Sequence, residues 1–297
     1  MCGIMGYYSF KEQKPDKDKI SIMFSLLESR GRDASGYAFI KGNNLIVDKA
    51  PIHSSAFVKS KEWQDLELPK IMIMHTRMKT QGSEQNPSNN HPLYNKEGVA
   101  IVHNGIIHND HEIFGKNQRD GEVDSEAVLA VFSSKTKGDK IKRVFDRVDG
   151  SFAVAIINKA EPDNLILIKK DNPIDIYYNT DQDILYFCSE REIMQEALGI
   201  KSESKRGFTV GEKDYHFYQM ENNHALILNK EGVESYKRYN TRDQWARNRD
   251  FGRYNVDRLT VQCPWCLSMT KYFDGLNHNK CEVCGAEISE EDLYEII

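Results

Sequence analysis

The second residue of the chain carries the two groups that an N-terminal nucleophile would use. The sequence opens Met1-Cys2-Gly3-Ile4, and removal of Met1 would leave a thiol and a free α-amine on Cys2. Such an amine has a reference pKa of about 7.7–8.0 and a thiol one of about 8.5, so the amine can take the thiol's proton. Cys2 is therefore a candidate nucleophile, although any cysteine after a start residue looks the same.

Two apolar runs further along the chain each end in a cluster of polar residues. Residues 71–75 (IMIMH) lead into Thr76-Arg77, and residues 98–102 (GVAIV) lead into His103-Asn104-Gly105. Runs of this length are typical of strands covered on both faces. We expect these strands to deliver their polar clusters to one edge of a sheet. An arginine at the end of a buried strand needs an anion from the protein or from a ligand.

Three further segments have a site-like composition, and each has a plain structural alternative. Residues 30–36 (RGRDASG) form a charged loop between glycines, which could equally be a surface turn. Residues 81–92 form a long polar loop, a kind that tends to be functional in a compact domain. Asp124 precedes a helix expected over 124–132, where it could also be a simple N-cap.

Taken in order, these motifs resemble a known enzyme domain. They are Cys2-Gly3-Ile4, Arg30-Gly31-x-Asp33, His75-Thr76-Arg77 with Thr80 and Gly82, Asn90-His91-Pro92, His103-Asn104-Gly105-Ile106 and Asp124-Ser125-Glu126. This series is similar to the class II glutamine amidotransferase domain, an N-terminal-nucleophile hydrolase family, and most of all to the glutaminase half of glucosamine-6-phosphate synthase. One departure is Met78-Lys79, where that subfamily carries a tryptophan over the substrate.

The resemblance implies an α+β fold of four layers, αββα, with two stacked antiparallel sheets over residues 2–238. It also implies hydrolysis of L-glutamine to glutamate and ammonia through a thioester on Cys2. Asn104 and Gly105 would stabilise the oxyanion, and no cofactor would be needed. The substrate's carboxylate and ammonium groups would bind Arg77, Thr80 and Asp124. The remaining motif residues, Arg30, Asp33, His75 and His103, would support the site.

The hydrophobic pattern of the rest of the chain agrees with packed sheets flanked by few helices. Helices are expected at 19–29, capped by Asp18 and stopped by Gly31, and at 124–132 and 190–198. Strands are expected at 2–10, 37–41, 71–75, 98–102, 151–157, 165–168, 175–178, 184–189, 215–219, 224–228 and 233–237. Cys188 lies inside one of them and is expected to be a buried apolar residue.

The last 37 residues contain a second group of candidate functional residues, four cysteines. Cys263, Cys266, Cys281 and Cys284 form two CxxC pairs separated by 14 residues. Four thiolates at this spacing predict a closed tetrahedral Zn²⁺ site in a module, residues 261–297, that looks like a zinc ribbon. A redox-active CxxC is the competing interpretation for the first pair. So short a module builds little core, so the metal would supply most of its folding free energy.

Residues 239–260 join the body to this module and are basic and aromatic. The stretch 237–258 holds seven Lys/Arg and three Asp, a local net charge of +4, interleaved with aromatic side chains. Such a segment can contact single-stranded nucleic acid. It can equally be a helix that docks on the body or on a partner, which we favour.

Composition limits the classes of function. The 297 residues include 40 Lys+Arg and 45 Asp+Glu, a net charge of −5, so no overall field draws the chain to nucleic acid or membrane. No apolar run approaches the ~20 residues that span a bilayer, and we expect no signal peptide before Cys2. Clustered cysteines in such a chain favour metal over disulfides. We therefore expect a cytoplasmic protein.

Three functions remain open at this point. The first is a glutamine-hydrolysing subunit that passes ammonia to a separate synthetase, because no acceptor segment is evident after residue 238. The second is an amidohydrolase of the same fold that acts on another γ-glutamyl compound. The third is a zinc-ribbon binding protein with an inactive amidotransferase domain, which would be expected to lack some of the site residues.

Overall fold

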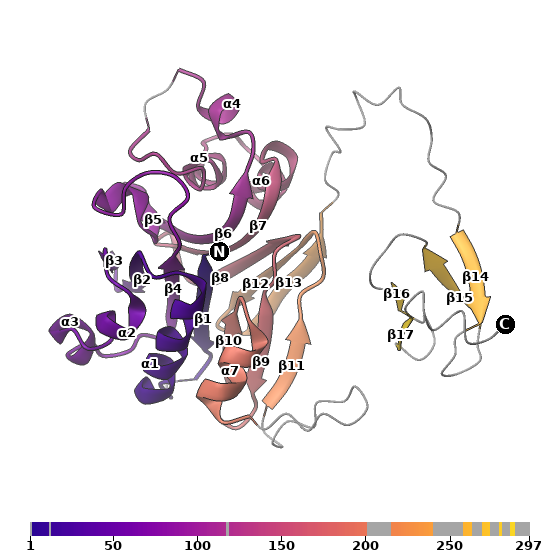
Figure 1. Cartoon of the computed structure of the whole chain (residues 1–297), viewed down its shortest axis with the longest axis horizontal. Coiled ribbons are helices and arrows are strands. Elements are labelled where there is room, and N and C mark those ends of the chain that lie inside the picture. Colours follow the sequence, from indigo (N-terminus) through magenta and orange to yellow (C-terminus); the bar gives the residue numbers. More distant parts are fainter. Residues whose placement is uncertain are drawn as a thin grey trace. The chain divides into compact units, whose positions relative to one another are not determined.

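Two antiparallel sheets, stacked face to face, form the first of the two compact units into which the chain divides, Met1–Arg242 and Asp243–Ile297 (Figure 1). The computed structural model describes residues 2–11, 13–116, 119–200 and 215–239, the strand segments 258–262, 269–273 and 279–280, and residues 286–288. The predicted linker (239–260) and the four tail cysteines lie almost wholly outside the described residues.

The first sheet has seven strands, with β1 and β4 at its centre. Their order is β11 (Tyr215–Gln219), β9 (Asp175–Asn179), β10 (Ile184–Cys188), β1 (Gly3–Ser9), β4 (Ile71–Arg77), β2 (Ala34–Lys41) and β3 (Asn44–Ala50). The second sheet has six strands, in the order β13 (Gly232–Arg238), β12 (His224–Asn229), β8 (Glu161–Lys170), β7 (Gly150–Asn158), β6 (Val99–Ile107) and β5 (Leu93–Tyr94).

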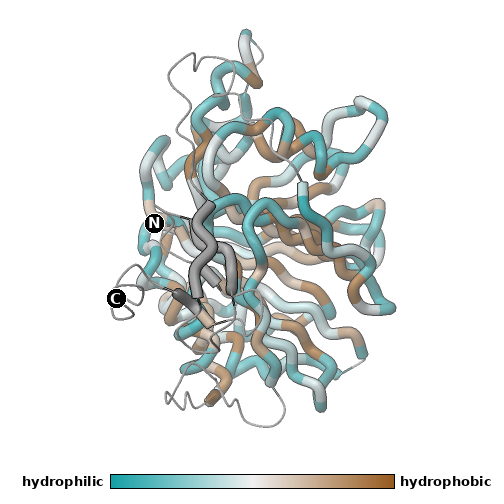
Figure 2. The backbone as a smooth tube through the Cα atoms, turned by 90° about the vertical axis from the view of Figure 1, so that its right-hand side faces the viewer, coloured by the Kyte–Doolittle hydropathy of each residue, from teal (hydrophilic) through white to brown (hydrophobic). Residues whose placement is uncertain are grey.

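Helices cover the outer face of each sheet. They are α1 (Lys17–Leu26), α2 (Ser54–Phe57), α3 (Lys61–Gln64), α4 (Asp110–Phe114), α5 (Glu126–Ser133), α6 (Lys140–Arg147) and α7 (Arg191–Leu198), with 3₁₀ turns η1 (Leu27–Arg30) and η2 (Pro87–Asn89). Three buried clusters separate the layers. One packs α1, α2 and α7 on the first sheet, one packs α5 and α6 on the second, and one lies between the sheets. Figure 2 shows the hydrophobic stretches following the strands inside this arrangement.

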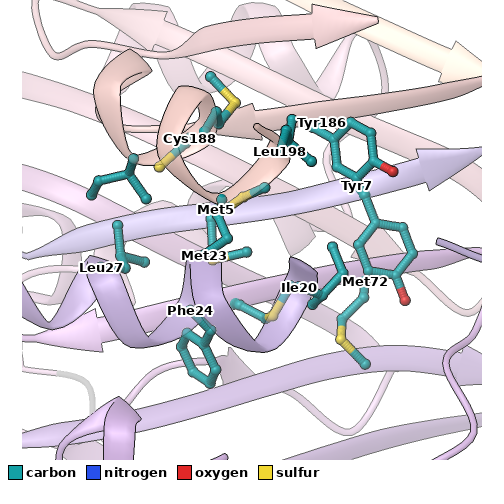
Figure 3. Packing of buried hydrophobic residues seen from close by; sticks show 14 of the residues in the cluster. Met5, Tyr7, Ile20, Met23, Phe24, Leu27, Met72, Tyr186, Cys188 and Leu198 are labelled. Carbon is teal, nitrogen blue, oxygen red and sulfur yellow. The ribbon is translucent and has the colours of Figure 1, made fainter. Parts of the chain in front are cut away.

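This layering explains why the central strands are apolar on both faces. In β1, Ile4 belongs to the cluster between the sheets, whereas Met5 and Tyr7 belong to the cluster under the helices. Figure 3 shows Met5 and Tyr7 packed with Ile20 and Met23 of α1. The prediction of an α+β fold with two stacked antiparallel sheets is confirmed.

One local prediction at α1 is wrong. Its N-cap is Asp16, whose side chain accepts hydrogen bonds from the backbone amides of Asp18 and Lys19, so Asp18 is not the cap. Gly31 is the C-cap of η1, as predicted, and its backbone there is extended, with φ −176°. A Cβ on Gly31 would lie under 3.0 Å from the backbone of Arg77 and Met78, so close approach to β4 excludes a side chain there.

The sequence also places several boundaries too early or leaves elements out. Strands β4 and β6 continue through their polar clusters to Arg77 and Ile107. The edge strand β3, the short helices α2–α4 and the helix α6 are additional to the prediction. No helix among the described residues is long and apolar enough to cross a membrane.

In the second unit the structure describes two pairs of strands. β14 (Arg258–Gln262) pairs antiparallel with β15 (Met269–Phe273), and β16 (Asn279–Lys280) pairs with β17 (Glu287–Ile288). In the sequence, the first CxxC pair falls between β14 and β15 and the second between β16 and β17.

Candidate active site

Cys2 immediately precedes β1, next to the end of β4. Gly3 pairs with Thr76 in the antiparallel ladder, so the register sets Cys2 beside Arg77. The Cys2 Sγ lies 3.5 Å from the carbonyl oxygen of Met78. Strand β1 also contacts β6 of the other sheet, and in Figure 1 its start lies beside β6. The thiol therefore lies at the end of the layer between the two sheets.

Arg30 holds the backbone of Cys2 in place. Its Nε donates to the Cys2 carbonyl oxygen at 2.9 Å, and its Nη1 pairs with Glu190 Oε1 at 2.6 Å. The guanidinium is buried, so these two contacts fix its orientation. The predicted supporting residue Arg30 thus contacts the main chain of the nucleophile, whereas its partner Glu190 was not foreseen from the sequence.

Asp33, the other charged residue of the Arg30-Gly31-x-Asp33 motif, bonds to the main chain at and after the end of β4. Its Oδ2 accepts a hydrogen bond from the Lys79 amide at 2.6 Å, and its own amide donates to the Arg77 carbonyl oxygen at 2.9 Å. Asp33 therefore fixes the chain just after β4. Thr80 is exposed in the bend that follows.

Burial and two opposite charges act on the Cys2 thiol. Burial raises the pKa of the thiol above its usual value; the Arg77 charge lowers it and the Asp124 charge raises it. The two substrate-clamp candidates therefore both act on the candidate nucleophile, although they lie 47 residues apart in the sequence. Because the thiol remains protonated near neutral pH, attack by its sulfur requires a base.

The Arg77 guanidinium is oriented by neutral groups of the 81–90 loop (Gln81–Asn90). Nη1 donates to Asn90 Oδ1 at 2.9 Å, and Nη2 donates to the carbonyl oxygens of Gln81 and of Gly82, the latter at 3.0 Å. These bonds use three of its five N–H donors. No carboxylate pairs with Arg77 among the residues that the structure describes, so the expected anion is left to a ligand. The cation is thus available to attract one.

Asp124 is held by β6 and not by the helix that follows it. Its Oδ2 accepts a hydrogen bond from the Ile107 amide at 2.6 Å, and its Oδ1 lies 3.3 Å from Ser125 Oγ. The helix begins at Glu126 with Ser125 in the cap position, so Asp124 is not a simple side-chain N-cap. The Ser125 hydroxyl in turn lies 2.6 Å from His103 Nδ1. This contact links Ser125, the residue after Asp124, to β6, the strand that also holds Asp124.

Strand β6 supplies the two groups predicted to bind an oxyanion. Asn104 is buried, and its Nδ2 has no hydrogen-bond partner among the described residues. Gly105 has φ +147°, and a Cβ there would lie under 3.0 Å from Ser151 of β7, so only glycine fits. A buried amide donor without a partner costs about 1–3 kcal/mol in the folded state, a cost that a function can explain.

Three buried histidines fill the space beside this strand. His75 Nε2 lies 3.0 Å from the His103 carbonyl oxygen and links β4 to β6. The His75 ring stacks on His91 with centroids 4.2 Å apart. Burial lowers the pKa of His75 to about 3 and also lowers the pKa values of His91 and His103. All three rings are therefore neutral near pH 7. Without carrying charge, His75 contacts the His103 carbonyl oxygen and His103 contacts the Ser125 hydroxyl.

The predicted residues come from both sheets. Cys2 precedes β1 and Arg77 ends β4 of the first sheet, whereas Asn104 and Gly105 lie in β6 of the second. Arg30 lies in η1, and Asp124 lies in the loop before α5. Within the described ranges, no three His, Cys, Asp or Glu side chains are grouped so as to hold a metal ion. The four tail cysteines, Cys263, Cys266, Cys281 and Cys284, fall outside those ranges.

Comparisons with known proteins identify relatives of part of this chain. Residues 75–196 match a family model described as the glutamine amidotransferase domain. A glutamine–fructose-6-phosphate aminotransferase [isomerizing] from Clostridium perfringens is 35% identical over 183 residues, 59% of this chain and 29% of that protein. The enzyme of the same name from Fusobacterium nucleatum is 26% identical over 93% of this chain and 51% of that protein. The chain thus spans about half or less of these curated relatives.

Solved structures share the fold at lower identity. A glutamine phosphoribosylpyrophosphate amidotransferase from B. subtilis, complexed with ADP and GMP, matches 80% of this chain and 49% of its own, with a TM-score of 0.61 and 20% identity. A structure of the allosteric regulatory enzyme of purine biosynthesis matches 93% of this chain and 54% of its own, with a TM-score of 0.61 and 19% identity. At these identities the likeness establishes the fold of the layered body.

Proposed function

This chain contains a class II glutamine amidotransferase domain, and we propose from that premise that it hydrolyses L-glutamine to glutamate and ammonia through Cys2. The observation that carries the proposal is that the partly buried Cys2 thiol, whose pKa is raised by burial, is influenced by the Arg77 cation and by the Asp124 carboxylate. An α-amino acid carries the complementary pair of charges. Its side-chain amide would then extend toward the sulfur.

In the proposed first step the Cys2 sulfur attacks the amide carbon of glutamine, and the thiol proton passes to the α-amine of Cys2 that removal of Met1 exposes. The carbon–sulfur bond forms while the carbonyl oxygen takes up negative charge. Asn104 Nδ2 and the Gly105 amide stabilise this oxyanion, a role that fits the unpartnered amide of Asn104. The raised pKa of the thiol supports the need for such a base.

In the second step the carbon–nitrogen bond breaks, and the protonated α-amine returns its proton to the departing nitrogen, which leaves as ammonia. The γ-glutamyl thioester that remains on Cys2 is hydrolysed by water, which releases glutamate and restores the thiol. Arg77 binds the substrate's carboxylate with its remaining N–H donors, and Asp124 binds the substrate's ammonium group, with Thr80 as a further contact.

We also propose that the ammonia passes to an acceptor site on a separate synthetase and that the second unit helps in this docking. The relatives named for fructose-6-phosphate are about two to three times as long as the matched region, so their acceptor chemistry is not carried over. Zn²⁺ held by Cys263, Cys266, Cys281 and Cys284 would order the unit, and its two strand pairs around the CxxC pairs support this. The basic linker would bind the synthetase or a nucleic-acid substrate.

Covalent labelling tests the proposed chemistry. Treatment with 6-diazo-5-oxo-L-norleucine, a glutamine analogue with an electrophilic carbon, should place one label on Cys2, and glutamine should protect against it. Cys2→Ala should abolish both labelling and glutamine hydrolysis. The matched control is Cys188→Ala, because Cys188 is fully buried and burial raises the pKa of its thiol to about 12. Hydrolysis that survives Cys2→Ala would refute the mechanism.

The same assay separates the alternatives. Hydrolysis of γ-glutamyl conjugates in preference to free glutamine would indicate an amidohydrolase of the same fold. Absence of both labelling and turnover, in protein from which Met1 has been removed, would indicate a binding protein with an inactive site. Material that retains Met1 has an amide nitrogen in place of the base and should lose most of its activity.

A further inference from the structure

Two loops lie at the charged groups of the proposed clamp, and one side chain joins these loops. The 81–90 loop contacts Arg77, at the end of β4, through the carbonyl oxygens of Gln81 and Gly82. The 119–125 loop (Arg119–Ser125) contains Asp124. We propose that Asn89 is a positioning residue that fixes these loops to each other and thereby sets the distance between the two charges that hold the substrate; the inference rests on the proposed function.

The Asn89 amide makes hydrogen bonds to both loops at once. Its Nδ2 donates to the Ser83 carbonyl oxygen at 3.0 Å and to Glu122 Oε2 at 2.8 Å. Its Oδ1 accepts from the Glu122 amide at 2.7 Å. Asn89 has no exposed surface, whereas Glu122 is exposed, so the Asn89 end of each bond is shielded from water. Asn89 thus bonds to Glu122 twice, through its amide nitrogen to the carboxylate and through its amide oxygen to the backbone amide. Two bonds to one partner fix the orientation of the Asn89 amide.

Two glycines show how closely the loops surround this amide. A Cβ on Gly82, which has φ +68°, would lie under 3.0 Å from the Asn89 side chain. A Cβ on Gly121 would lie 2.8 Å from Asn89 Oδ1 and 2.8 Å from the Ser88 carbonyl oxygen. Backbone from each loop thus packs directly on Asn89, with no space for a side chain between them.

The next residue, Asn90, makes its hydrogen bonds to Arg77 and to the 81–90 loop. Asn90 Oδ1 accepts from Arg77 Nη1, and Asn90 Nδ2 donates to the Glu84 carbonyl oxygen at 2.7 Å. Consecutive asparagines at the end of η2 therefore bind in two directions, Asn90 toward the guanidinium and Asn89 toward the 119–125 loop. Asn89 itself contacts no group of the proposed reaction.

The far side of the 119–125 loop is anchored independently. Arg119 Nη1 pairs with Asp110 at 2.7 Å, its Nε pairs with Glu126 at 3.2 Å, and its Nη2 donates to the Val123 carbonyl oxygen at 2.6 Å. Glu122 lies between Arg119 and Val123, which this anchor joins. Loss of Asn89 should therefore shift the loop locally, near Glu122, and leave its attachment to α4 and α5 intact.

The test compares two amides that differ only in what Asp124 would bind. L-Glutamine carries an α-ammonium group, and glutaramate (5-amino-5-oxopentanoate) lacks it. Asn89→Ala should raise KM for L-glutamine about tenfold or more, the effect of losing a hydrogen bond to a charged group. It should change kcat/KM for glutaramate less than about threefold and so reduce the preference for glutamine. Alkylation of Cys2 by iodoacetamide should proceed as in the wild type.

A conservative pair of variants identifies the contact. Asn89→Asp keeps the acceptor for the Glu122 amide but removes the donors and sets a carboxylate against that of Glu122, so it should raise KM as Asn89→Ala does. Adding Glu122→Gln restores a donor and should recover most of the loss. Asn95→Ala is the matched control, because Asn95 bonds Ser133 and Val99 in the turn after β5 and should leave KM unchanged.

Two results would overturn the proposal. One is an equal loss with both amides in Asn89→Ala, which would indicate general loosening of the fold; the other is an unchanged KM for glutamine. Hydrogen exchange at the Glu122 amide makes the test independent of activity. Faster exchange in Asn89→Ala supports the bridge and unchanged exchange refutes it, even if the wild type fails to hydrolyse glutamine and the proposed function is wrong.

Discussion

In the proposed mechanism, catalysis and folding make opposite demands on Asn104. Its buried Nδ2 has no partner within the described part of the chain, so the folded state bears the cost of an unsatisfied donor. An oxyanion that forms only during the reaction would satisfy it. The amide is therefore preorganised for a group that is absent from the ground state.

We expect Asn104→Ala to lower kcat for glutamine hydrolysis by about 10²–10³-fold with little change in KM, because the lost donor acts in the transition state. Steady-state kinetics measures both constants. The control is Asn109→Ala: Asn109 is also buried, but it donates to the Arg147 carbonyl oxygen at 2.8 Å and accepts from the Asp149 amide at 2.9 Å. That change should reduce stability more than kcat. An Asn104→Ala enzyme with wild-type kcat would remove Asn104 from the mechanism.

The buried histidines make stability depend on pH. In the unfolded chain a histidine binds a proton near pH 6.5, whereas burial lowers the pKa of His75 to about 3 in the folded protein. Between these values the unfolded chain holds more protons, so stability falls as pH falls from about 6.5 toward 3. For His75 alone the loss reaches about 2 kcal/mol at pH 5, and the lowered pKa values of His91 and His103 act in the same direction.

Urea unfolding at pH 7 and pH 5 measures this loss. The wild type should lose stability between the two pH values, and His75→Gln should lose less. His111→Gln, a change at an exposed histidine, should leave the difference as in the wild type. Equal stability of the wild type at both pH values would contradict the expected neutrality of the cluster.

At the scale of single elements, the first turn of α1 allows a direct comparison of two aspartates. Asp16 caps the helix with its Oδ1, whereas Asp18 lies in the first turn and donates only its backbone amide to that cap. Asp16→Ala should destabilise the protein by about 1 kcal/mol. Asp18→Ala should cost less, since it removes only a favourable charge at the helix start. Chemical denaturation of the two variants, side by side, checks the order; the reverse order would restore Asp18 as the cap.

The periodicity of the sequence determines most of the elements but not their ends. The spacing of Ile20, Met23 and Phe24 predicts the buried face of α1, because a period of 3.6 residues leaves one apolar stripe. The cap is ambiguous, since both Asp16 and Asp18 precede that stripe. Strand β4 passes through His75-Thr76-Arg77 because the backbone of these residues continues the ladders to β1 and β2, whatever side chains they carry.

Partly exposed and short elements escape the sequence pattern. Strand β3 is an edge strand that mixes charged and apolar residues, so it lacks the continuous apolar run of a central strand. Helix α6 has an apolar face, Ile141, Val144 and Phe145, within a segment that is otherwise charged. Both elements form because they pack against or pair with strands that lie elsewhere in the sequence, so the local sequence does not indicate them.

In the candidate site, too, the sequence indicates some residues and not others. The motifs identify Cys2, Arg77 and Asp124 as candidates, but the contacts that orient them come from distant residues. Arg30 pairs with Glu190 across 160 positions, and Asn89 pairs with Glu122 across 33. No local pattern indicates such pairs, because they result from how β1, β4 and the two loops meet in space.

At the scale of the whole molecule, the site requires both sheets. The thiol and the guanidinium follow the first sheet, whereas Asn104, Gly105 and the support of Asp124 come from β6 of the second. The cluster between the sheets, which includes Ile4, Ile73 and Val102, therefore holds the two halves of the site together.

The second unit should depend on metal. We expect one Zn²⁺ per chain, bound by the four thiolates of Cys263, Cys266, Cys281 and Cys284. Chelation should unfold residues 243–297 and leave the unit Met1–Arg242 folded, because the latter has its own three-part core. Metal analysis of protein purified without chelator, combined with circular dichroism, measures both effects. Cys263→Ser should reproduce the loss, whereas Cys188→Ser should not; zinc-free protein with four titratable tail thiols would refute the site.

The fate of the ammonia connects the two units. Ammonia in neutral water is mostly ammonium, which is not a nucleophile, so hydrolysis is useful only if the product reaches an acceptor before it escapes. We therefore expect slow glutamine turnover by the isolated protein and faster turnover when a synthetase and its acceptor substrate are bound. The 81–90 loop is the element that could transmit this effect, because its backbone contacts Arg77 directly. Deletion of residues 243–297 should remove the increase but leave basal hydrolysis unchanged, since every predicted residue of the glutamine site lies in the unit Met1–Arg242. Glutamate release measured with and without candidate partner proteins checks both parts. If turnover by the isolated protein is fast and no partner or acceptor raises it, the protein is a glutaminase that acts alone, and the proposed coupling is wrong.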